Sequence, residues 1–130
     1  MKLLLDTHIL IWAASEPDKI GKAATRRIED PRTELWFSPL SVSEILNLNK
    51  RGRLRYGDPR WWLPELQRQM NLLEAPITFE IAFETSHFAL PHGDPIDQLL
   101  VATARILKLT MFTVDEKIIQ SGAIPVLANR

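Results

Sequence analysis

The feature that most constrains the fold is a short apolar run at the start of the chain, Lys2–Leu5, which ends at an acidic residue, Asp6. A short continuous apolar run is expected for a strand that is buried on both faces of a parallel sheet. Similar runs follow at Glu34–Ser38, Leu72–Ile77, Leu109–Val114 and Ile124–Leu127. Helical patterns separate them, and hairpin signals of the Asn-Gly type do not occur. The sequence therefore predicts a three-layer α/β/α fold with a mainly parallel central sheet.

Apolar residues at helical spacing predict the helices that connect these strands. The expected helical segments are Ile9–Ala14, Ile20–Ile28, Leu40–Leu48, Trp61–Met70, Thr78–Phe88, Ile96–Leu107 and Asp115–Ser121. Asp58-Pro59 and Asp94-Pro95 each supply an N-cap acid followed by a first-turn proline. Residues 1–130 contain no internal repeat, linker or low-complexity segment, so we expect a single domain.

The composition argues against several classes of protein. No cysteine is present, which removes disulfides, thiolate catalysis and cysteine-ligated zinc or iron–sulfur sites, and which agrees with a reducing compartment such as the cytoplasm. No apolar stretch approaches the roughly 20 residues needed to span a bilayer, so no membrane association is expected. The 16 basic residues balance the 16 acidic residues, and net charge therefore gives no argument for a nucleic-acid partner.

Acidic residues recur at the predicted ends of strands and at the predicted starts of helices. Asp6 and Asp115 directly follow strands, and Glu44 and Asp97 are expected in the first turns of helices. In an open parallel sheet the carboxyl ends of the strands share one edge, where ligands bind at the switch in strand order. We therefore expect these four side chains to converge at that edge.

Each acid also has a purely structural explanation. Asp6 and Asp115 can cap the helices that follow them, because a carboxylate accepts hydrogen bonds from the unpaired N–H groups of a first turn. Glu44 stands three residues after Ser41, which is the spacing of a capping box. Asp94 is expected to cap the helix that carries the fourth acid. The residues alone leave capping and ligand binding open.

Converging carboxylates repel one another and raise each other's pKa unless a cation lies between them. A divalent ion is the simplest such cation. The available ligands are oxygen atoms, without cysteine or a paired histidine motif, and they suit Mg²⁺ or Mn²⁺ better than zinc. The acids are therefore candidate ligands of Mg²⁺ in a hydrolytic site.

A resemblance to a known family is carried by the segments Leu4–His8, Ser43–Ile45, His92–Ala104 and Phe112–Asp115. In this order they resemble the signatures of PIN-domain proteins, particularly the VapC-type toxins of type II toxin–antitoxin systems, over nearly the whole chain. The resemblance implies a PIN-like, metal-dependent ribonuclease in which Asp6, Glu44 and Asp97 hold the metal ion. It implies that Asp115 completes or supports the site.

The same resemblance concerns neighbouring residues and partners. Thr113 matches a hydroxyl position near the metal, whereas Gln98 stands where many relatives carry Arg, a departure that removes no acid. The implied partners are RNA, a cognate antitoxin protein that covers the site, and a second copy of the chain in a homodimer. The helices Ile9–Ala14 and Trp61–Met70 are expected to offer the apolar surface for an amphipathic helix of a partner.

Basic residues concentrate after the third expected helix, where we expect contacts to RNA. The candidates are Lys50, Arg51, Arg53 and Arg55. They can guide phosphate groups toward the acids. Their alternative role is that of a solvated helix end whose cations complement the helix dipole.

Other enzymes and a non-enzyme remain as alternatives. His8, His87 and His92 can supply the acid–base pair of a metal-free ribonuclease that forms cyclic phosphates. A phosphatase with Asp6 as nucleophile would carry a second Asp at position 8, where this chain has His8. The third alternative is a non-catalytic PIN-like domain that binds another protein through its apolar helices.

Overall fold

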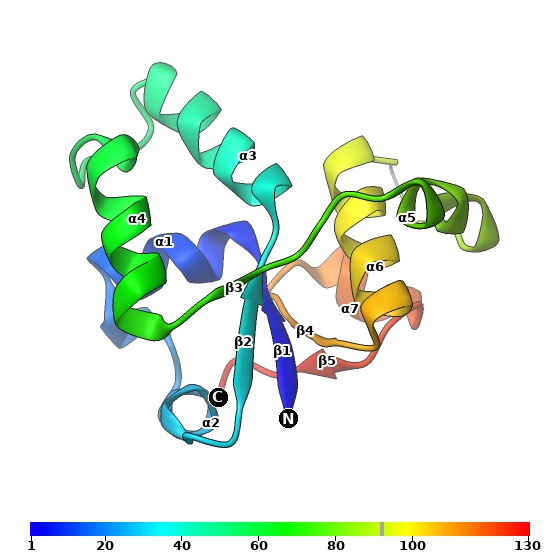
Figure 1. The fold of residues 1–130 in the computed structure, drawn as a ribbon, viewed down its shortest axis with the longest axis horizontal. Coiled ribbons are helices and arrows are strands. Elements are labelled where there is room, and N and C mark those ends of the chain that lie inside the picture. Colours follow the sequence, from blue (N-terminus) through cyan, green and yellow to red (C-terminus); the bar gives the residue numbers. More distant parts are fainter. Residues whose placement is uncertain (92) are drawn as a thin grey trace.

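A five-stranded parallel sheet forms the centre of the computed structural model, which describes residues 1–91 and 93–130 (Figure 1). Its strands are β1 (Lys2–Leu5), β2 (Glu34–Phe37), β3 (Leu73–Glu74), β4 (Thr110–Phe112) and β5 (Val126–Leu127). The strand order is β3-β2-β1-β4-β5, and every neighbouring pair is parallel. The prediction of a parallel central sheet is confirmed.

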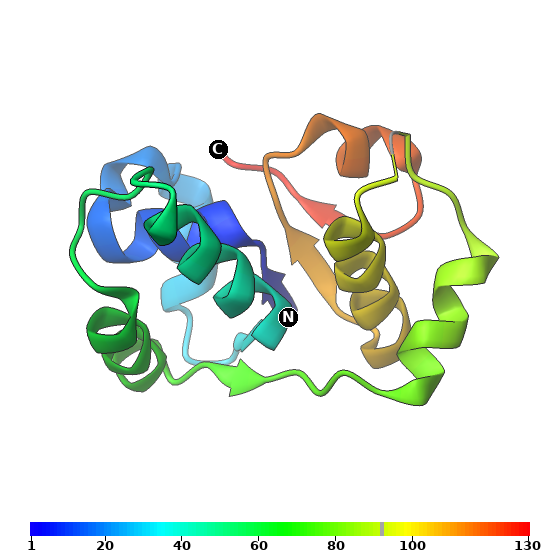
Figure 2. The ribbon, with the colours of Figure 1, turned by 90° about the horizontal axis from the view of Figure 1, so that it is seen from above.

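Helices cover both faces of this sheet. They are α1 (Thr7–Ser15), α2 (Lys22–Glu29), α3 (Pro39–Lys50), α4 (Pro59–Met70), α5 (Phe79–Glu84), α6 (Pro95–Leu107) and α7 (Glu116–Ser121), with short 3-10 turns at Pro17–Lys19 and Thr85–His87. Helices α1–α4 lie on one side and α5–α7 on the other, as Figure 2 shows from above. This is the predicted three-layer arrangement. None of the helices in the described residues has the length and apolar character needed to cross a membrane.

The first strand joins the two halves of the core. Leu3 and Leu5 pack into the apolar cluster beneath α1–α4, whereas Leu4 packs into the cluster beneath α6 and α7. All three side chains have 0% exposed surface. Burial of one leucine contributes about 1.5–3 kcal/mol. The uninterrupted apolar run at the start of the sequence therefore reflects a strand that is covered on both faces.

The two edge strands are shorter than predicted because proline interrupts each of them. The run Leu72–Ile77 pairs only over β3, since Pro76 has no N–H to donate after the bond from Ala75 N to Phe37 O at 2.8 Å. The run Ile124–Leu127 pairs only over β5, because Pro125 can accept a bond from Met111 N at 2.9 Å but cannot donate one.

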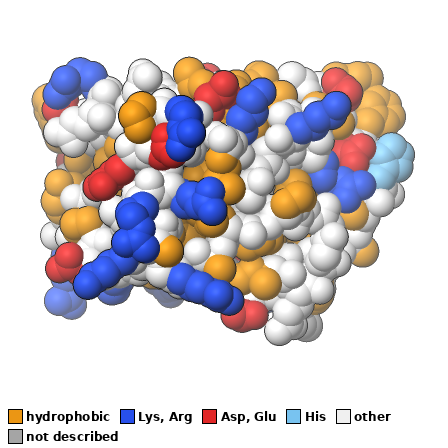
Figure 3. All heavy atoms as spheres, turned by 90° about the horizontal axis from the view of Figure 1, so that it is seen from below, with side chains coloured by type: hydrophobic (Ala, Val, Ile, Leu, Met, Phe, Trp, Pro, Cys, Tyr) orange, Lys and Arg blue, Asp and Glu red, His pale blue; other side chains and the backbone are white. Residues whose placement is uncertain are grey.

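The strand order defines where a site can form. From β1 the chain adds β2 and β3 on one side of the sheet and then returns to add β4 and β5 on the other side. The switch point is thus between β1 and β4, at their carboxyl ends. The opposite face, below the amino ends of the strands, carries Lys and Arg side chains spread among apolar and acidic ones (Figure 3).

Candidate active site

Asp6 stands at the carboxyl end of β1 and begins α1. Its Oδ1 accepts a hydrogen bond from Thr7 N at 2.8 Å, which makes it the N-cap of that helix. Its Oδ2 accepts a hydrogen bond from Thr113 Oγ1 at 2.6 Å. Burial raises the pKa of Asp6, although the hydrogen bonds from Thr113 and Thr7 oppose the rise. The capping explanation is therefore correct, and the same carboxylate faces the switch point of the sheet.

Asp115 and Thr113 follow β4 and complete this edge. Thr113 is buried, and its Oγ1 accepts a hydrogen bond from Asp115 N at 3.0 Å while it donates to Asp6. Asp115 caps α7 through a bond from Lys117 N to its Oδ1 at 2.9 Å. The hydroxyl of Thr113 thus links the residue that follows β1 to the residues that follow β4.

Glu44 lies further along its helix than the sequence predicts. The N-cap of α3 is Ser38, whose Oγ accepts a bond from Leu40 N at 3.1 Å, and Pro39 occupies the first helical position. Ser41 is therefore inside the helix, and the capping-box explanation of Glu44 is wrong. Glu44 projects from the second turn of α3 rather than from the first.

Asp97 lies in the first turn of α6. Asp94 caps that helix, as predicted, with a bond from Ile96 N to its Oδ1 at 2.9 Å. The pKa of Asp97 is raised from 3.8 to about 7, first by burial and then by the negative charges of the neighbouring acids Asp94, Asp6, Asp115 and Glu44. This shift shows that acids from distant parts of the chain act on one another electrostatically.

These acids share one cleft of about 360 Å³ at the carboxyl edge of β1 and β4. Its lining residues are Asp6, His8, Glu44, Asp94, Asp97, Val114, Asp115 and Lys117. The structure thus brings together all the acids that the sequence predicts to converge. Lys117 is the residue that the sequence analysis missed. Lys117 stands two residues after Asp115, in the turn that Asp115 caps, and this position could have indicated that it lies beside the acids.

The acids fit a divalent cation by their chemistry but are not preformed around one. In residues 1–91 and 93–130, no group of three or more acidic or histidine side chains is placed to hold one ion directly. The oxygen ligands are those that Mg²⁺ and Mn²⁺ prefer, and Mg²⁺ usually keeps several waters when it binds. Burial is the main cause of the raised pKa of Asp97, and the neighbouring negative charges, which a cation would offset, add to the rise. Metal binding by these residues stays a prediction.

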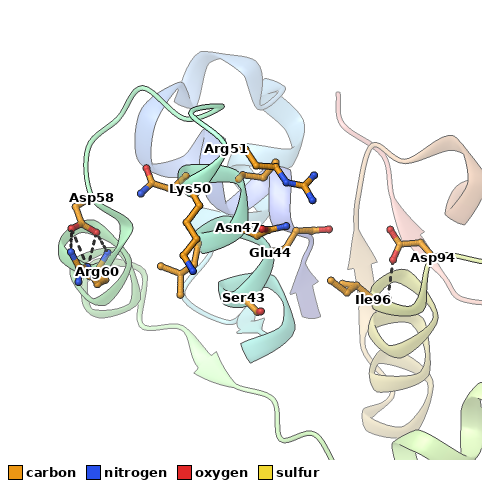
Figure 4. A pocket seen from close by; sticks show the side chains of 12 residues that line it. Ser43, Glu44, Asn47, Lys50, Arg51, Asp58, Arg60, Asp94 and Ile96 are labelled. Carbon is orange, nitrogen blue, oxygen red and sulfur yellow. Dashed lines mark hydrogen bonds and ion pairs between the residues drawn. The ribbon is translucent and has the colours of Figure 1, made fainter.

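A larger groove of about 920 Å³ adjoins the acids and carries part of the predicted basic segment. Glu44 and Asp94 line it together with Lys50 and Arg51. Figure 4 shows Glu44 and Arg51 pointing from α3 toward Asp94, which lies across the space between α3 and α6. Arg60 also lines the groove but is paired with Asp58 at 2.7 Å.

The other two predicted basic residues lie elsewhere. Arg53 and Arg55 line a separate cleft of about 390 Å³, which also contains Tyr56 and Trp62. Tyr56 and Trp62 contact each other edge to face, with their ring centroids 5.5 Å apart. The four basic candidates therefore do not form one surface, and only Lys50 and Arg51 share a groove with the acids.

The histidines of the rival mechanism are dispersed among the described residues. His8 lines the acidic cleft and contacts Trp12, whereas His87 follows α5 and pairs with Glu84 at 2.9 Å. The third histidine, His92, lies outside the described residues. Gln98 stands at the position where the family resemblance implies Arg. Its side chain donates a hydrogen bond to Thr85 O at 3.5 Å, and it is not among the described residues that line the acidic cleft.

Comparison with known proteins agrees with this arrangement of sheet and acids. A family model described as "PIN domain" matches residues 3–123. Ribonuclease VapC22 of Mycobacterium tuberculosis (strain ATCC 25618 / H37Rv) is 33% identical over 106 residues, which cover 78% of each protein. The chain therefore belongs to the PIN-domain family.

Solved structures show the same fold at lower sequence identity. VapBC2 from Rickettsia felis, bound to a DNA fragment from its promoter, gives a TM-score of 0.74 at 16% identity, with 98% of each chain covered. VapBC-1 from nontypeable Haemophilus influenzae gives a TM-score of 0.71 at 20% identity, with 98% of this chain and 97% of that chain covered. These similarities support the fold alone.

The raised pKa of Asp97 predicts an unusual pH dependence of stability. The folded protein keeps a proton on Asp97 up to about pH 7, whereas the unfolded chain releases it near 3.8. The unfolded state therefore binds fewer protons in this interval, and the free energy of unfolding of the ion-free protein falls as pH rises through it. We expect Asp97→Asn to reduce this fall, measured as the urea midpoint in EDTA from pH 5 to pH 8.

A matched control is Asp18→Asn, which changes an exposed carboxylate in the 3-10 turn Pro17–Lys19. It should leave the pH dependence as in the original chain. Equal pH profiles for Asp97→Asn and the original chain would show that Asp97 ionises normally in the folded protein.

Proposed function

We propose that the protein is a Mg²⁺-dependent endoribonuclease and the toxin of a toxin–antitoxin pair. The observation that carries the proposal is the cleft at the β1–β4 switch point, where four predicted acids meet and the pKa of Asp97 is raised to about 7. The similarity to Ribonuclease VapC22 supports the ribonuclease activity. Metal-dependent phosphodiester hydrolysis is the chemistry that such a cluster of carboxylates suits.

The residues have distinct proposed roles. Asp6, Glu44 and Asp97 would hold Mg²⁺, or Mn²⁺ in its place, directly or through water, with Asp115 as a further ligand or a water-orienting residue. When bound, the ion supplies charge that offsets the phosphoryl group and lowers the pKa of water. Thr113 keeps Asp6 oriented through its hydrogen bond at 2.6 Å.

Products separate this proposal from the histidine mechanism. Hydrolysis by water leaves a 5′-phosphate and a 3′-hydroxyl and does not require the 2′-OH of the substrate. A preference for RNA must then come from binding. A metal-free mechanism that uses histidine as acid and base would instead leave a cyclic phosphate.

The first test is RNA cleavage with Mg²⁺, with Mn²⁺ and with EDTA. We expect cleavage with either ion and none in EDTA, because the acids alone cannot offset the charge of the phosphoryl group. Asp97→Asn should abolish cleavage in a folded protein. Full activity in EDTA with cyclic-phosphate products would refute the metal-dependent mechanism.

Asp94 provides the matched control in the same turn of α6. Asp94→Asn retains a side chain that caps well, so stability and most of the activity should persist. Asp94→Ala removes the bond to Ile96 N and should cost about 0.5–2 kcal/mol of unfolding free energy. A stable but inactive Asp94→Asn, together with an active Asp97→Asn, would reverse the assigned roles.

The proposed RNA path follows the groove that joins the acids to Lys50 and Arg51. A strand in this groove would place phosphates near both cations before it reaches Glu44 and Asp94, which line the same groove. Neither Lys50 nor Arg51 forms an ion pair within the described residues, so both charges are available to phosphate. Arg53 and Arg55 line another cleft and can contribute only if the strand extends beyond this groove.

Salt dependence can test this division of the basic residues. In the inactive Asp97→Asn background, Lys50→Ala with Arg51→Ala should weaken binding of single-stranded RNA and reduce the slope of log Kd against log salt. Each lost phosphate contact should reduce the slope by about 0.7. The matched pair Arg53→Ala with Arg55→Ala removes the same charge from the other cleft and should change the affinity for a short oligonucleotide less. Equal losses for both pairs would contradict the proposed path.

An antitoxin partner would need a docking surface, and the structure offers one between α3 and α4. This cleft of about 270 Å³ is lined mainly by apolar side chains, namely Leu10, Phe37, Val42, Leu46, Pro59, Leu63, Pro64 and Leu72, with Arg60, Gln67 and Glu74 among them. Helix α1 contributes only Leu10 to this lining, and Ile9, Leu10 and Ile11 all belong to the buried core. Of the two helices expected to offer apolar surface to a partner, α4 thus lines this cleft and α1 contributes little to it.

Solved complexes of proteins with this fold support the proposal of a protein partner. The solved structures with this fold include VapBC2 from Rickettsia felis, VapBC-1 from nontypeable Haemophilus influenzae and a toxin–antitoxin complex from Klebsiella pneumoniae. An amphipathic helix of the partner can fill the α3–α4 cleft. A basic side chain of the partner can bind the carboxylates in place of the metal ion. Homodimerisation is proposed to use the exposed Phe79 and Phe83 of α5, whose rings contact each other edge to face with their centroids 4.8 Å apart.

Co-expression with the small protein encoded beside this gene tests the partner. We expect the two proteins to co-purify, RNA cleavage to fall and toxicity to the host to disappear. Leu63→Lys, which places a charge in the apolar cleft, should weaken this capture without affecting cleavage by the free protein. Toxicity and activity that do not change with the neighbouring protein would remove the antitoxin while leaving the nuclease proposal intact.

A further inference from the structure

A buried hydrogen bond between two hydroxyl groups joins the start of α1 to the start of α3. Thr7 Oγ1 donates to Ser41 Oγ at 3.1 Å. The exposed fractions of these residues are 1% and 0%, so neither hydroxyl is available to bulk solvent. A buried hydroxyl costs folding free energy unless it is hydrogen-bonded, and apolar side chains could fill the same space. The pair therefore calls for an explanation beyond packing.

One member of this pair hydrogen-bonds to a carboxylate of the acidic cleft, and the other lies on the helix that carries another. Thr7 donates its backbone N–H to Asp6 Oδ1 at 2.8 Å and is the first residue of α1. Ser41 lies one turn before Glu44 on α3. The bond between the hydroxyls thus links the end of β1, which carries Asp6, to the helix that carries Glu44.

The inner face of α3 carries both the Ser41 hydroxyl and an apolar contact to α1, and the two constrain the helix differently. Ile45, on the turn after Ser41, is fully buried in the core cluster that also contains Ile9 of α1. Apolar contacts of this kind hold the helices together but allow small shifts along the interface. An O–H···O hydrogen bond has a narrow range of favourable distances and angles, so it fixes the position of α3 relative to α1.

We propose that Thr7 and Ser41 are positioning residues that set the separation between Asp6 and Glu44 so that both can bind one divalent ion. This inference rests on the proposed metal site. Asp115 is already tied to Asp6 through Thr113, and the Thr7–Ser41 bond extends the same hydrogen-bonded frame to α3. The frame links the elements that carry these acids, β1, β4 and α3, whereas the acidic side chains in the described residues are not preformed around an ion.

The experiment is a calorimetric titration of the full chain with Mn²⁺. Removal of a hydrogen bond made directly to a metal ligand typically weakens binding 10–100-fold. The Thr7–Ser41 bond acts one step further from the ligands, so we expect Ser41→Ala and Thr7→Val each to raise the Kd for Mn²⁺ by about tenfold, the lower end of that range. Thr7→Ser keeps the hydroxyl and should restore most of the affinity. Ser41→Ala removes a single oxygen atom, which provides a folded variant should Thr7→Val fail to fold.

A matched control comes from Thr103, which is equally buried but donates within its own helix to Leu99 O at 2.7 Å. Thr103→Val should lower the urea midpoint by a similar amount and leave the Kd for Mn²⁺ unchanged. The decisive comparison repeats Ser41→Ala in a Glu44→Gln background. If Ser41 acts by positioning Glu44, the second change should add no further loss of affinity.

Three outcomes overturn the inference. If the original chain binds Mn²⁺ and Ser41→Ala binds it equally well, the positioning role fails while the proposed metal site stands. If Ser41→Ala costs the same fold-change with and without the Glu44 carboxylate, the hydroxyl acts on stability alone. If the original chain does not bind Mn²⁺, the metal site itself fails, and the positioning role fails with it.

Discussion

Repulsion among carboxylates at the carboxyl ends of β1 and β4 is the constraint around which this site is arranged. It contributes to the raised pKa values of Asp6 and Asp97, in addition to burial. The chain offsets part of the repulsion by placing Asp6, Asp97 and Asp115 at the N-termini of α1, α6 and α7, where helix dipoles favour negative charge. Capping and ligand binding are therefore compatible functions. A carboxylate has about four acceptor positions, so a bond to a helix N–H leaves capacity for a cation.

The parts of the fold that depend on local patterns could be predicted, and the parts that depend on neighbours could not. The run Lys2–Leu5 predicted a strand covered on both faces, and the Asp94-Pro95 pair predicted the start of α6. The lengths of β3 and β5 are limited by which N–H groups meet a partner strand, so Pro76 and Pro125 shortened runs that looked continuous in the sequence. The strand order itself follows from long-range packing, and no local pattern in the chain indicates it or the register of the strands.

The site shows the same division between local and long-range information. Asp6 and Asp115 could be placed because each directly follows a strand, but Glu44 was placed one turn too early because Ser38 and Pro39 start α3 before the expected cap. The candidate RNA contacts Lys50, Arg51, Arg53 and Arg55 lie close together in the sequence. Gly52, which follows α3, adopts a left-handed conformation with φ of 69°. The chain changes direction at this glycine, and the residues after it line another cleft. Nothing in the spacing of the four cations indicates this turn.

The proposed activity and the proposed inhibition draw on the same unbalanced charge. Glu44 and Asp94 line both the acidic cleft and the groove that contains Lys50 and Arg51, so a phosphate that follows the cations meets carboxylates at the end of its path. Phosphate and carboxylate repel each other, and a productive complex requires a cation between them. A divalent ion is small enough to lie between the phosphate and the carboxylates and still leave room for the substrate. An arginine from a partner neutralises the acids equally well but occupies that room. Because Asp97 has a pKa of about 7, protons compete with both cations below neutral pH and hardly compete above it. In the proposed mechanism, metal binding, partner binding and protonation are three alternative ways of neutralising these acids. An arginine of the partner fills the space that RNA needs, whereas protonation leaves the space open but supplies no cation for the phosphoryl group.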